Sequence, residues 1–207
     1  MLFIILNIQT CLFNIYFYCM IKQRGQVIVD KILDTAERLF FKQGYNVTGI
    51  NQVIEEADIA KASLYKHFES KTDLLLAYLQ RTHERWFDNL GDYVNKVADP
   101  REKLLTLIDY HRERQLKNGY SGCRFIKAND EAGMSDERVL AEIQKAKQHF
   151  KDFIAELVIN SGHQKLLTDK ELTDLIFMML DGGIVAASIF KQADDLQSAR
   201  AIIQKLL

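Results

Sequence analysis

Helix-breaking residues are scarce in this sequence. Only one of its 207 residues is proline and ten are glycine, whereas 48% are hydrophobic. Leucine, isoleucine, alanine, lysine and glutamate are abundant instead, and all but isoleucine rank among the good helix formers. The composition therefore predicts an all-α protein, and the length allows one or two domains with a sizeable core.

An excess of charge and a cysteine framework are also missing. The 27 basic and 28 acidic residues leave a net charge of −1, so any contact with DNA must come from a local basic surface. The three cysteines, Cys11, Cys19 and Cys123, have neither disulfide nor zinc spacing, which suits a reducing cytoplasm. The five histidines are scattered without a set of partner ligands, so we expect no metal site.

Motifs of catalysis are absent from the sequence as well. We find no Ser-His-Asp set, no recognisable carboxylate pair and no phosphate-binding loop. We therefore expect no catalytic residue, no cofactor and no enzymatic activity.

The first 21 residues are the one long apolar run. They carry no charged side chain and are followed by Lys22 and Arg24. Their length is close to the roughly 20 residues that span a bilayer, but a secretory signal would have a basic start and a small-residue cleavage site. Three interpretations stay open: translation that begins at Met20, a membrane anchor that leaves the rest in the cytoplasm, and a soluble extension. We expect the first, treat residues 1–19 as an extension, and expect no stable membrane association.

Helical periodicity and capping residues divide the rest of the chain. Gly44 suits the left-handed end of the first helix, and Thr48 can cap the next one. Asp58 tolerates a left-handed backbone at the following corner, a third helix is expected over about 60–68, and Ser70 can cap a fourth. Asp99-Pro100 has the order of an N-cap followed by proline at the first helical position. Further helices are expected to start near Cys123, Asp136, Thr168 (with a capping box to Glu171) and Asp194.

Residues 48–71 have the pattern of two short helices joined by a tight corner. A helix-turn-helix places its second helix in the major groove of DNA, with an apolar inner face and a small, polar outer face. Leu64 and Phe68 would form the inner face, and no acidic residue occurs on the expected helix. Lys61 can donate to guanine or phosphate, and Tyr65 can donate to a phosphate oxygen. Spacing alone equally fits an ordinary helical hairpin.

The same stretch resembles the signature of TetR-type transcriptional repressors over about residues 27–79. The resemblance is carried by Gly44-Tyr45, Thr48, Val53-Ile54, the run from Ile59 to Phe68 (IAKASLYKHF), Ser70-Lys71 and Leu74-Leu75. It implies a homodimeric all-α regulator. Residues 20–87 would form a three-helix helix-turn-helix DNA-binding domain, and residues 88–207 a helical ligand-binding and dimerisation domain.

The resemblance also implies which residues face DNA. Together with the outward small and basic residues of the reading helix, the candidates are Thr48, Lys61, Ala62, Ser63, Tyr65, Lys66, His67 and Lys71. His67 fits a partly buried structural role equally well. Three positions depart from the family pattern and leave the operator sequence open: Gly49 replaces a Ser or Thr, Asp58 a turn glycine, and Ala60 a capping Ser or Thr.

The second domain is expected to dimerise and to enclose a ligand pocket. Leu180-Asp181-Gly182-Gly183 resembles the dimer-helix pattern of the family, and Gly122-Cys123 with Asn129 and Glu131 resembles a pattern of one branch. Glycine in a helix costs about 1 kcal/mol relative to alanine. Close contact between two copies, through the helix over 171–190 and the C-terminal helix, would offset this; close packing within one chain is the alternative.

Candidate pocket residues come from apolar faces of this domain, where any one of them could instead be plain core. They are Trp86, Tyr110, His111, Cys123, Phe125, Asn129, Phe150, Phe177 and Met178. Cys123 lies at an expected helix start beside Arg124, and both features favour a thiolate that could sense oxidants or electrophiles. A small buried residue is the alternative interpretation of Cys123.

The sequence thus predicts a cytoplasmic, ligand-responsive DNA-binding regulator, most simply a repressor. Its expected partners are a palindromic double-stranded operator, a second copy of itself, and a small molecule or reactive electrophile that releases it. Two reading helices must lie about 34 Å apart, or a multiple of that, to engage a palindrome. A ligand that binds better to a mis-spaced dimer lowers the affinity for DNA. The alternative is a membrane-anchored helical interaction protein tethered by residues 1–21.

Overall fold

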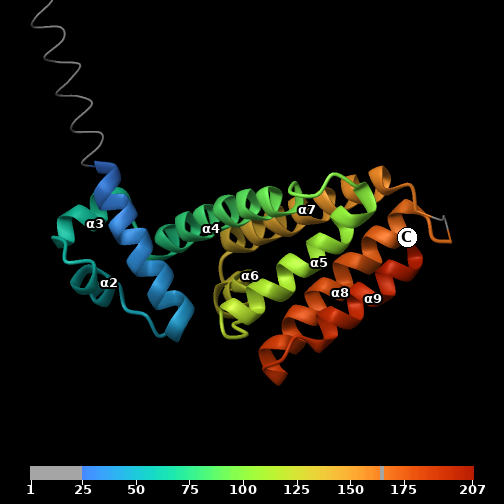
Figure 1. Cartoon of the computed structure of the whole chain (residues 1–207). Helices are drawn as coiled ribbons and strands as arrows, with labels where there is room; N and C mark the ends of the chain where they lie inside the picture. The colour runs from blue at the N-terminus through green and yellow to red at the C-terminus, as the bar shows by residue number, and fades with distance from the viewer. Residues whose placement is uncertain (1–24, 164–165) are drawn as a thin grey trace, which may run out of the picture. The chain divides into compact units, whose positions relative to one another are not determined.

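The structure is a computed structural model that describes residues 25–163 and 166–207. These residues form helices joined by short turns, with no β-strand among them (Figure 1). The predicted all-α fold is confirmed. The apolar segment 1–21, and with it the question of an anchor or a later start, lies outside the described residues.

The chain divides into two compact units between Tyr78 and Leu79. This division falls inside helix α4, Lys71–Val94, and so does the boundary at 87/88 that the sequence suggests. One helix therefore contributes residues to both units.

The N-terminal unit contains a helix over residues 25–43, α2 (Ile50–Glu56), α3 (Lys61–His67) and the first turns of α4. Its apolar residues recur every three or four positions, so each helix turns one face inward. The buried side chains include Ile32, Leu33, Ala36, Phe40, Val53, Ala57, Leu64, Phe68, Leu74 and Leu75. Burial of Leu64 and Phe68 sets the orientation of α3.

The turns of this unit follow the sequence with one exception. Gly44 (φ 96°) and Asp58 (φ 47°) both adopt the expected left-handed backbone. Ser70 caps α4, since its Oγ accepts a hydrogen bond from the Asp73 amide at 3.1 Å. The prediction that Thr48 caps α2 is wrong: Gly49 is the N-cap, and no side chain caps this helix.

The C-terminal unit is built from the remainder of α4 and six further elements. They are α5 (Pro100–Lys117), α6 (Arg124–Ala128), the π-helix η1 (Asn129–Gly133), α7 (Glu137–Ser161), α8 (Asp169–Phe190) and α9 (Asp194–Leu206). Helices α5, α7, α8 and α9 pack on one another around a core of leucine and isoleucine. Asp99 caps α5 and Asp136 caps α7, each through its own side chain, and Thr168 forms the expected capping box with Glu171.

Two elements of this unit, η1 and α8, have unusual backbone geometry or composition. The π-helix η1 extends the short helix up to Gly133, where a side chain would lie 2.7 Å from Asn129 Oδ1. Helix α8 is the one described helix that is long and apolar enough to span a membrane. A core helix of a soluble protein passes the same test, and α8 packs against α5, α7 and α9.

Candidate functional site

The outer face of α3 is exposed, small and basic. Lys61, Ala62, Tyr65 and Lys66 are exposed, whereas Ser63 and His67 are half-buried. Leu64, between them, is fully buried and fixes which side of the helix faces outward. The structure therefore brings these six predicted residues onto one short helix, which carries no acidic residue.

Lys71 lies just beyond α3, at the start of α4, and is positioned by Tyr45. The Lys71 ammonium lies 4.1 Å from the centroid of the Tyr45 ring, within the range of a cation–π contact. Tyr45 is itself held by a 3.2 Å hydrogen bond between its hydroxyl and Thr72 Oγ1 and by an edge contact with Phe40. In the sequence Tyr45 stands out only as part of the family pattern, and nothing there indicates that it orients Lys71.

Thr48 is directed into the domain rather than outward. Its side chain is fully buried, and its hydroxyl donates a 2.6 Å hydrogen bond to the Gly44 carbonyl. The same oxygen accepts a hydrogen bond from Gln43 Nε2 at 3.2 Å. Thr48 thus stabilises the turn before α2, and we leave it out of the DNA-facing set.

Two acidic side chains near this surface are paired with basic residues. Glu56, at the end of α2, lies 2.6 Å from the Arg38 guanidinium. The pKa of Glu56 is lowered by hydrogen bonds from Gln52 and Arg38. Asp58, at the corner, lies 3.5 Å from the Lys31 ammonium. Glu56 and Asp58 are therefore paired with basic residues from the first helix, and α3 itself carries no acidic residue.

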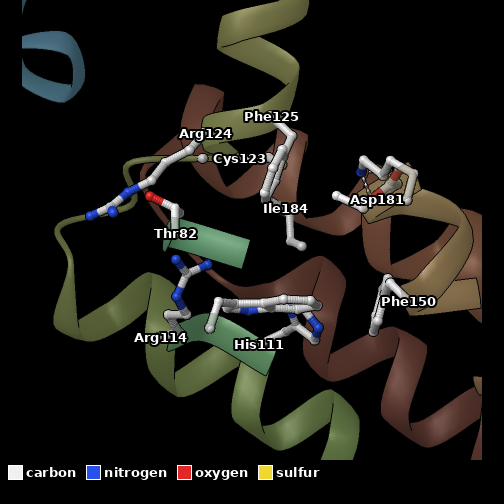
Figure 2. A pocket seen from close by; sticks show the side chains of 13 residues that line it. Thr82, His111, Arg114, Cys123, Arg124, Phe125, Phe150, Asp181 and Ile184 are labelled. Atoms are coloured by element: carbon white, nitrogen blue, oxygen red, sulfur yellow. Dashed lines mark hydrogen bonds and ion pairs between the residues drawn. The ribbon is translucent and has the colours of Figure 1, made fainter. Parts of the chain in front are cut away.

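A small cavity lies inside the C-terminal unit, between α4, α5, α6, α7 and α8 (Figure 2). Its volume is about 40 Å³, which is room for only a few water molecules. The side chains and loop residues around it are Thr82, Trp86, His111, Arg114, Gly122, Cys123, Arg124, Phe125, Ala146, Lys147, Phe150, Asp181 and Ile184.

Five of the nine predicted pocket residues line this cavity: Trp86, His111, Cys123, Phe125 and Phe150. The other four do not. Met178 is 61% exposed on α8, Phe177 borders a separate groove beside Lys151, and Tyr110 packs against Tyr93 and His111. Asn129 lies in η1 next to Gly133. These four were chosen for apolarity or the family pattern, and neither indicates which face of a helix turns toward the cavity.

His111 is the most buried polar residue of the cavity wall. Burial, together with the positive charges of Arg114 and Lys147, lowers the pKa of His111 to about 3. The imidazole is therefore neutral at physiological pH, with one nitrogen as donor and the other as acceptor. Neither nitrogen has a hydrogen-bond partner among the described residues.

Gln115 holds the segment that presents Cys123 to the cavity. The buried Gln115 side chain accepts a 3.0 Å hydrogen bond from the Gly122 amide and donates a 3.3 Å hydrogen bond to its carbonyl. Gly122 adopts a φ of 78°, and a side chain there would lie 3.1 Å from Ser188 Cβ. Cys123 follows as the N-cap of α6 and is half-buried. The sequence did not single out Gln115, because a glutamine carries no signal of its own.

Apolar side chains on α8 are exposed to solvent on one face. Met178, Val185 and Ile189 follow the spacing of a single helix face, and Phe190 adds to it. A side chain at Gly182, which lies on the same face, would meet nothing within 4 Å. Gly183 differs, because a side chain there would lie 2.6 Å from Leu196 of α9. Packing within one chain therefore explains Gly183 but not Gly182.

Comparison with known proteins finds likeness over both units. The family model "Bacterial regulatory proteins, tetR family" matches residues 32–78. The transcriptional activator FasR of Mycolicibacterium smegmatis is 26% identical over 137 residues, which are 66% of this chain and 59% of FasR. The alignment thus spans less than two thirds of FasR.

Two further likenesses cover most of the chain. The transcriptional regulator LmrA of Bacillus subtilis is 26% identical over 185 residues, which are 86% of this chain and 95% of LmrA. The crystal structure of E. coli NemR in its reduced form has a TM-score of 0.75 at 20% identity and covers 86% of this chain and 96% of that one. This last likeness concerns the fold alone.

Proposed function

Since this chain belongs to the TetR family of bacterial regulators, we propose that it is a repressor that binds a palindromic operator as a homodimer and is released by a small-molecule effector. Like its relatives, it is a DNA-binding transcription regulator and not an enzyme. We place it in the cytoplasm, without stable membrane association. FasR is named an activator, so repression is a part of the proposal that needs its own test.

The exposed basic face of α3 carries the proposal for DNA binding. Lys61, Lys66 and Lys71 can neutralise phosphates, while Ala62 and Ser63 allow close approach to base edges. Tyr65 is 42% exposed and lies one helical turn after Lys61, whose ammonium is 5.9 Å from the Tyr65 ring centroid. The proposed DNA-facing set is therefore Lys61, Ala62, Ser63, Tyr65, Lys66, His67 and Lys71.

Salt-dependent binding to the DNA upstream of the protein's own gene tests this assignment. A labelled duplex is titrated with the full chain at several salt concentrations, and anisotropy gives the dissociation constant. Each phosphate contact contributes about 0.9 to the slope of log affinity against log salt. Lys61→Ala should weaken binding and reduce the slope by about two per dimer. Lys117→Ala, at an exposed position of α5, is the matched control; equal effects of the two substitutions would contradict the assignment.

The exposed apolar face of α8 supports the proposed homodimer. A stable dimer buries such a face against its own copy, and a two-fold axis brings the same face of each copy together. Gly182 would allow the two α8 helices to approach closely, and α9 lies beside α8 to complete a four-helix bundle.

Helix α4 offers a route from effector to DNA. It supplies Thr82 and Trp86 to the cavity, and its first turn carries Lys71. The cavity is too small for most effectors as it stands, so binding would move lining side chains and α4 with them. Such a movement would change the spacing of the two reading helices, and the effector would release DNA by its differential affinity for the two spacings.

Modification of Cys123 is a second means of release, favoured by its position in the cavity wall. A bulky or oxidised thiol there would occupy the space of an effector. Replacement of Cys123 with serine and measurement of operator release by hypochlorite or a reactive aldehyde tests this. An unchanged response would rule out Cys123 as the sensor and leave the small-molecule route intact.

A further inference from the structure

Three hydrogen-bonding groups of the cavity wall lack partners among the described residues. They are Thr82 Oγ1, Trp86 Nε1 and the ring nitrogens of His111. Thr82 is 5% exposed and His111 is 3% exposed, so bulk water does not satisfy them. A buried donor or acceptor without a partner destabilises the folded state. The cavity therefore contains groups that a bound molecule with acceptor oxygens would satisfy, because the indole N–H can only donate.

The charges of the cavity wall are unequal. Arg114, Arg124 and Lys147 are cationic, and Asp181 is the one carboxylate among the lining residues. Asp181 lies 2.6 Å from Lys147. In Figure 2 Arg114, Arg124 and Thr82 are drawn on one side of the cavity, with Asp181 on the other. The positive side thus has two guanidinium groups and a hydroxyl, the groups that bind a carboxylate well.

The rest of the wall is aromatic. Trp86 and Phe150 meet edge to face with ring centroids 5.2 Å apart, and His111 lies 5.9 Å from Trp86 and 5.3 Å from Phe150. Phe125 and Ile184 close the opposite wall in Figure 2. These rings contact one another and form a continuous apolar surface, which suits the aromatic ring of a ligand. Because a cavity of about 150 Å³ holds one benzene ring, the 40 Å³ here must widen even for a single ring.

We propose that this cavity binds a small aromatic monocarboxylate, with its carboxylate at Arg114, Arg124 and Thr82 and its ring against Trp86 and Phe150. The inference rests on the proposed function in taking this cavity as the effector site. A neutral His111 adds no further charge to the wall that faces the ring.

Trp86 makes the proposal directly measurable, because it is the only tryptophan of the chain. The full chain is titrated with phenylacetate, phenylacetamide and phenethylamine, which share a benzyl body and differ in head-group charge, and tryptophan fluorescence is followed. We expect a saturable change with phenylacetate, at least about tenfold weaker binding of the amide, and weaker binding still of the amine. Equal or tighter binding of the amide or amine would overturn the proposal, as would no saturation by phenylacetate up to about 10 mM.

Variants of Arg114, Arg124 and Thr82 test where the carboxylate of the ligand binds. Arg114→Gln with Arg124→Gln should remove the preference for phenylacetate over the amide, whereas Arg138→Gln on the exposed start of α7 should leave it unchanged. Should the double variant not fold, Thr82→Val and the single arginine variants replace it, each expected to lose at least about threefold in phenylacetate affinity. A preference that persists in all of them overturns the proposal.

Binding to the upstream DNA separates this inference from the proposed function. Salt-dependent operator binding with no response to phenylacetate would leave the regulator intact and reject this ligand class. If the wild-type chain does not bind the operator, the proposed function as a DNA-binding regulator is rejected. The fluorescence titration would still decide which class of ligand the cavity binds.

Discussion

Gly49 is where the proposed DNA-binding surface lacks a hydroxyl that the family pattern contains. It is exposed, has an extended backbone with φ −79° and ψ 145°, and has no atom within 4 Å of where a side chain would begin. It is also the N-cap of α2, a position that serine favours. Nothing in the local structure therefore demands glycine there.

We expect Gly49→Ser to strengthen operator binding by about threefold to tenfold, since a serine hydroxyl adds a phosphate contact and caps α2. The anisotropy titration described above measures this. Gly91→Ser is the matched control, because Gly91 also has open space and lies in the C-terminal unit. Weaker or unchanged binding by the Gly49 variant would argue against α2 approaching a phosphate.

His111 makes the stability of the protein depend on pH. Its pKa in the folded state is about 3, against an ordinary value of 6.5. The unfolded state therefore binds a proton that the folded state does not, and stability is lost as pH falls below 6.5. From pH 6.5 to 5.5 this one group should lower the free energy of unfolding by about 1 kcal/mol.

Urea unfolding of the full chain and of His111→Leu at these two pH values checks this. The wild type should lose more stability than the variant, by the amount that His111 contributes. The same pH dependence in both proteins would mean that His111 is protonated or hydrated in the folded state.

Helices and their ends could be predicted from the sequence where the signal is local. Gly44, Asp58, Ser70, Asp99 and the Thr168–Glu171 capping box each act within four residues of the backbone that they stabilise. The prediction that Thr48 caps α2 failed because a threonine hydroxyl can hydrogen-bond either to the following helix or to the preceding turn. Which of the two it does depends on burial. The π-helix over Asn129–Gly133 was missed because its sequence has no local pattern that distinguishes it from a continuing α-helix.

Only part of the cavity wall could be predicted from the sequence. Apolar periodicity identified Trp86, Phe125 and Phe150 as inward-facing, but Thr82, Arg114, Lys147 and Asp181 come from four helices that meet only in the folded chain. Polar residues at the edges of apolar faces look like ordinary surface in the sequence. Their convergence is tertiary information.

The two glycines of α8 separate packing within the chain from contact between chains. Gly183→Ala should lower the free energy of unfolding by about 1–3 kcal/mol, because the methyl group would overlap Leu196. Gly182→Ala should be neutral or slightly stabilising to the isolated chain. Chemical denaturation of the two variants at matched concentration measures the difference. Equal destabilisation at low protein concentration would show that our assignment of Gly182 to the outer face is wrong.

Dimer formation is tested at the same position with a larger side chain. Gly182→Arg should leave the helical content of each chain intact, since nothing in the chain lies within 4 Å, and should shift the protein from dimer to monomer. Analytical ultracentrifugation gives the oligomeric state directly, with Gln144→Arg on an exposed part of α7, outside the proposed interface, as the control. A dimer that survives Gly182→Arg would move the interface elsewhere.

At the scale of the whole molecule, we propose that a dimer binds palindromic DNA. Each copy would insert one α3, and the exposed faces of α8 would fix how far apart the two lie. Because the net charge is −1, the chain has little general attraction for DNA, so affinity must come from the local basic surface of each copy.

The most direct test of this account changes the spacing of the operator. The half-sites found in the upstream DNA are separated by five extra base pairs, about half a helical turn, which turns them to opposite faces of the duplex. We predict at least about a hundredfold loss of affinity relative to the natural spacing, to the level of a scrambled site. Undiminished binding to the respaced site would contradict the proposal that two α3 helices, held at a fixed distance by one dimer, engage the operator.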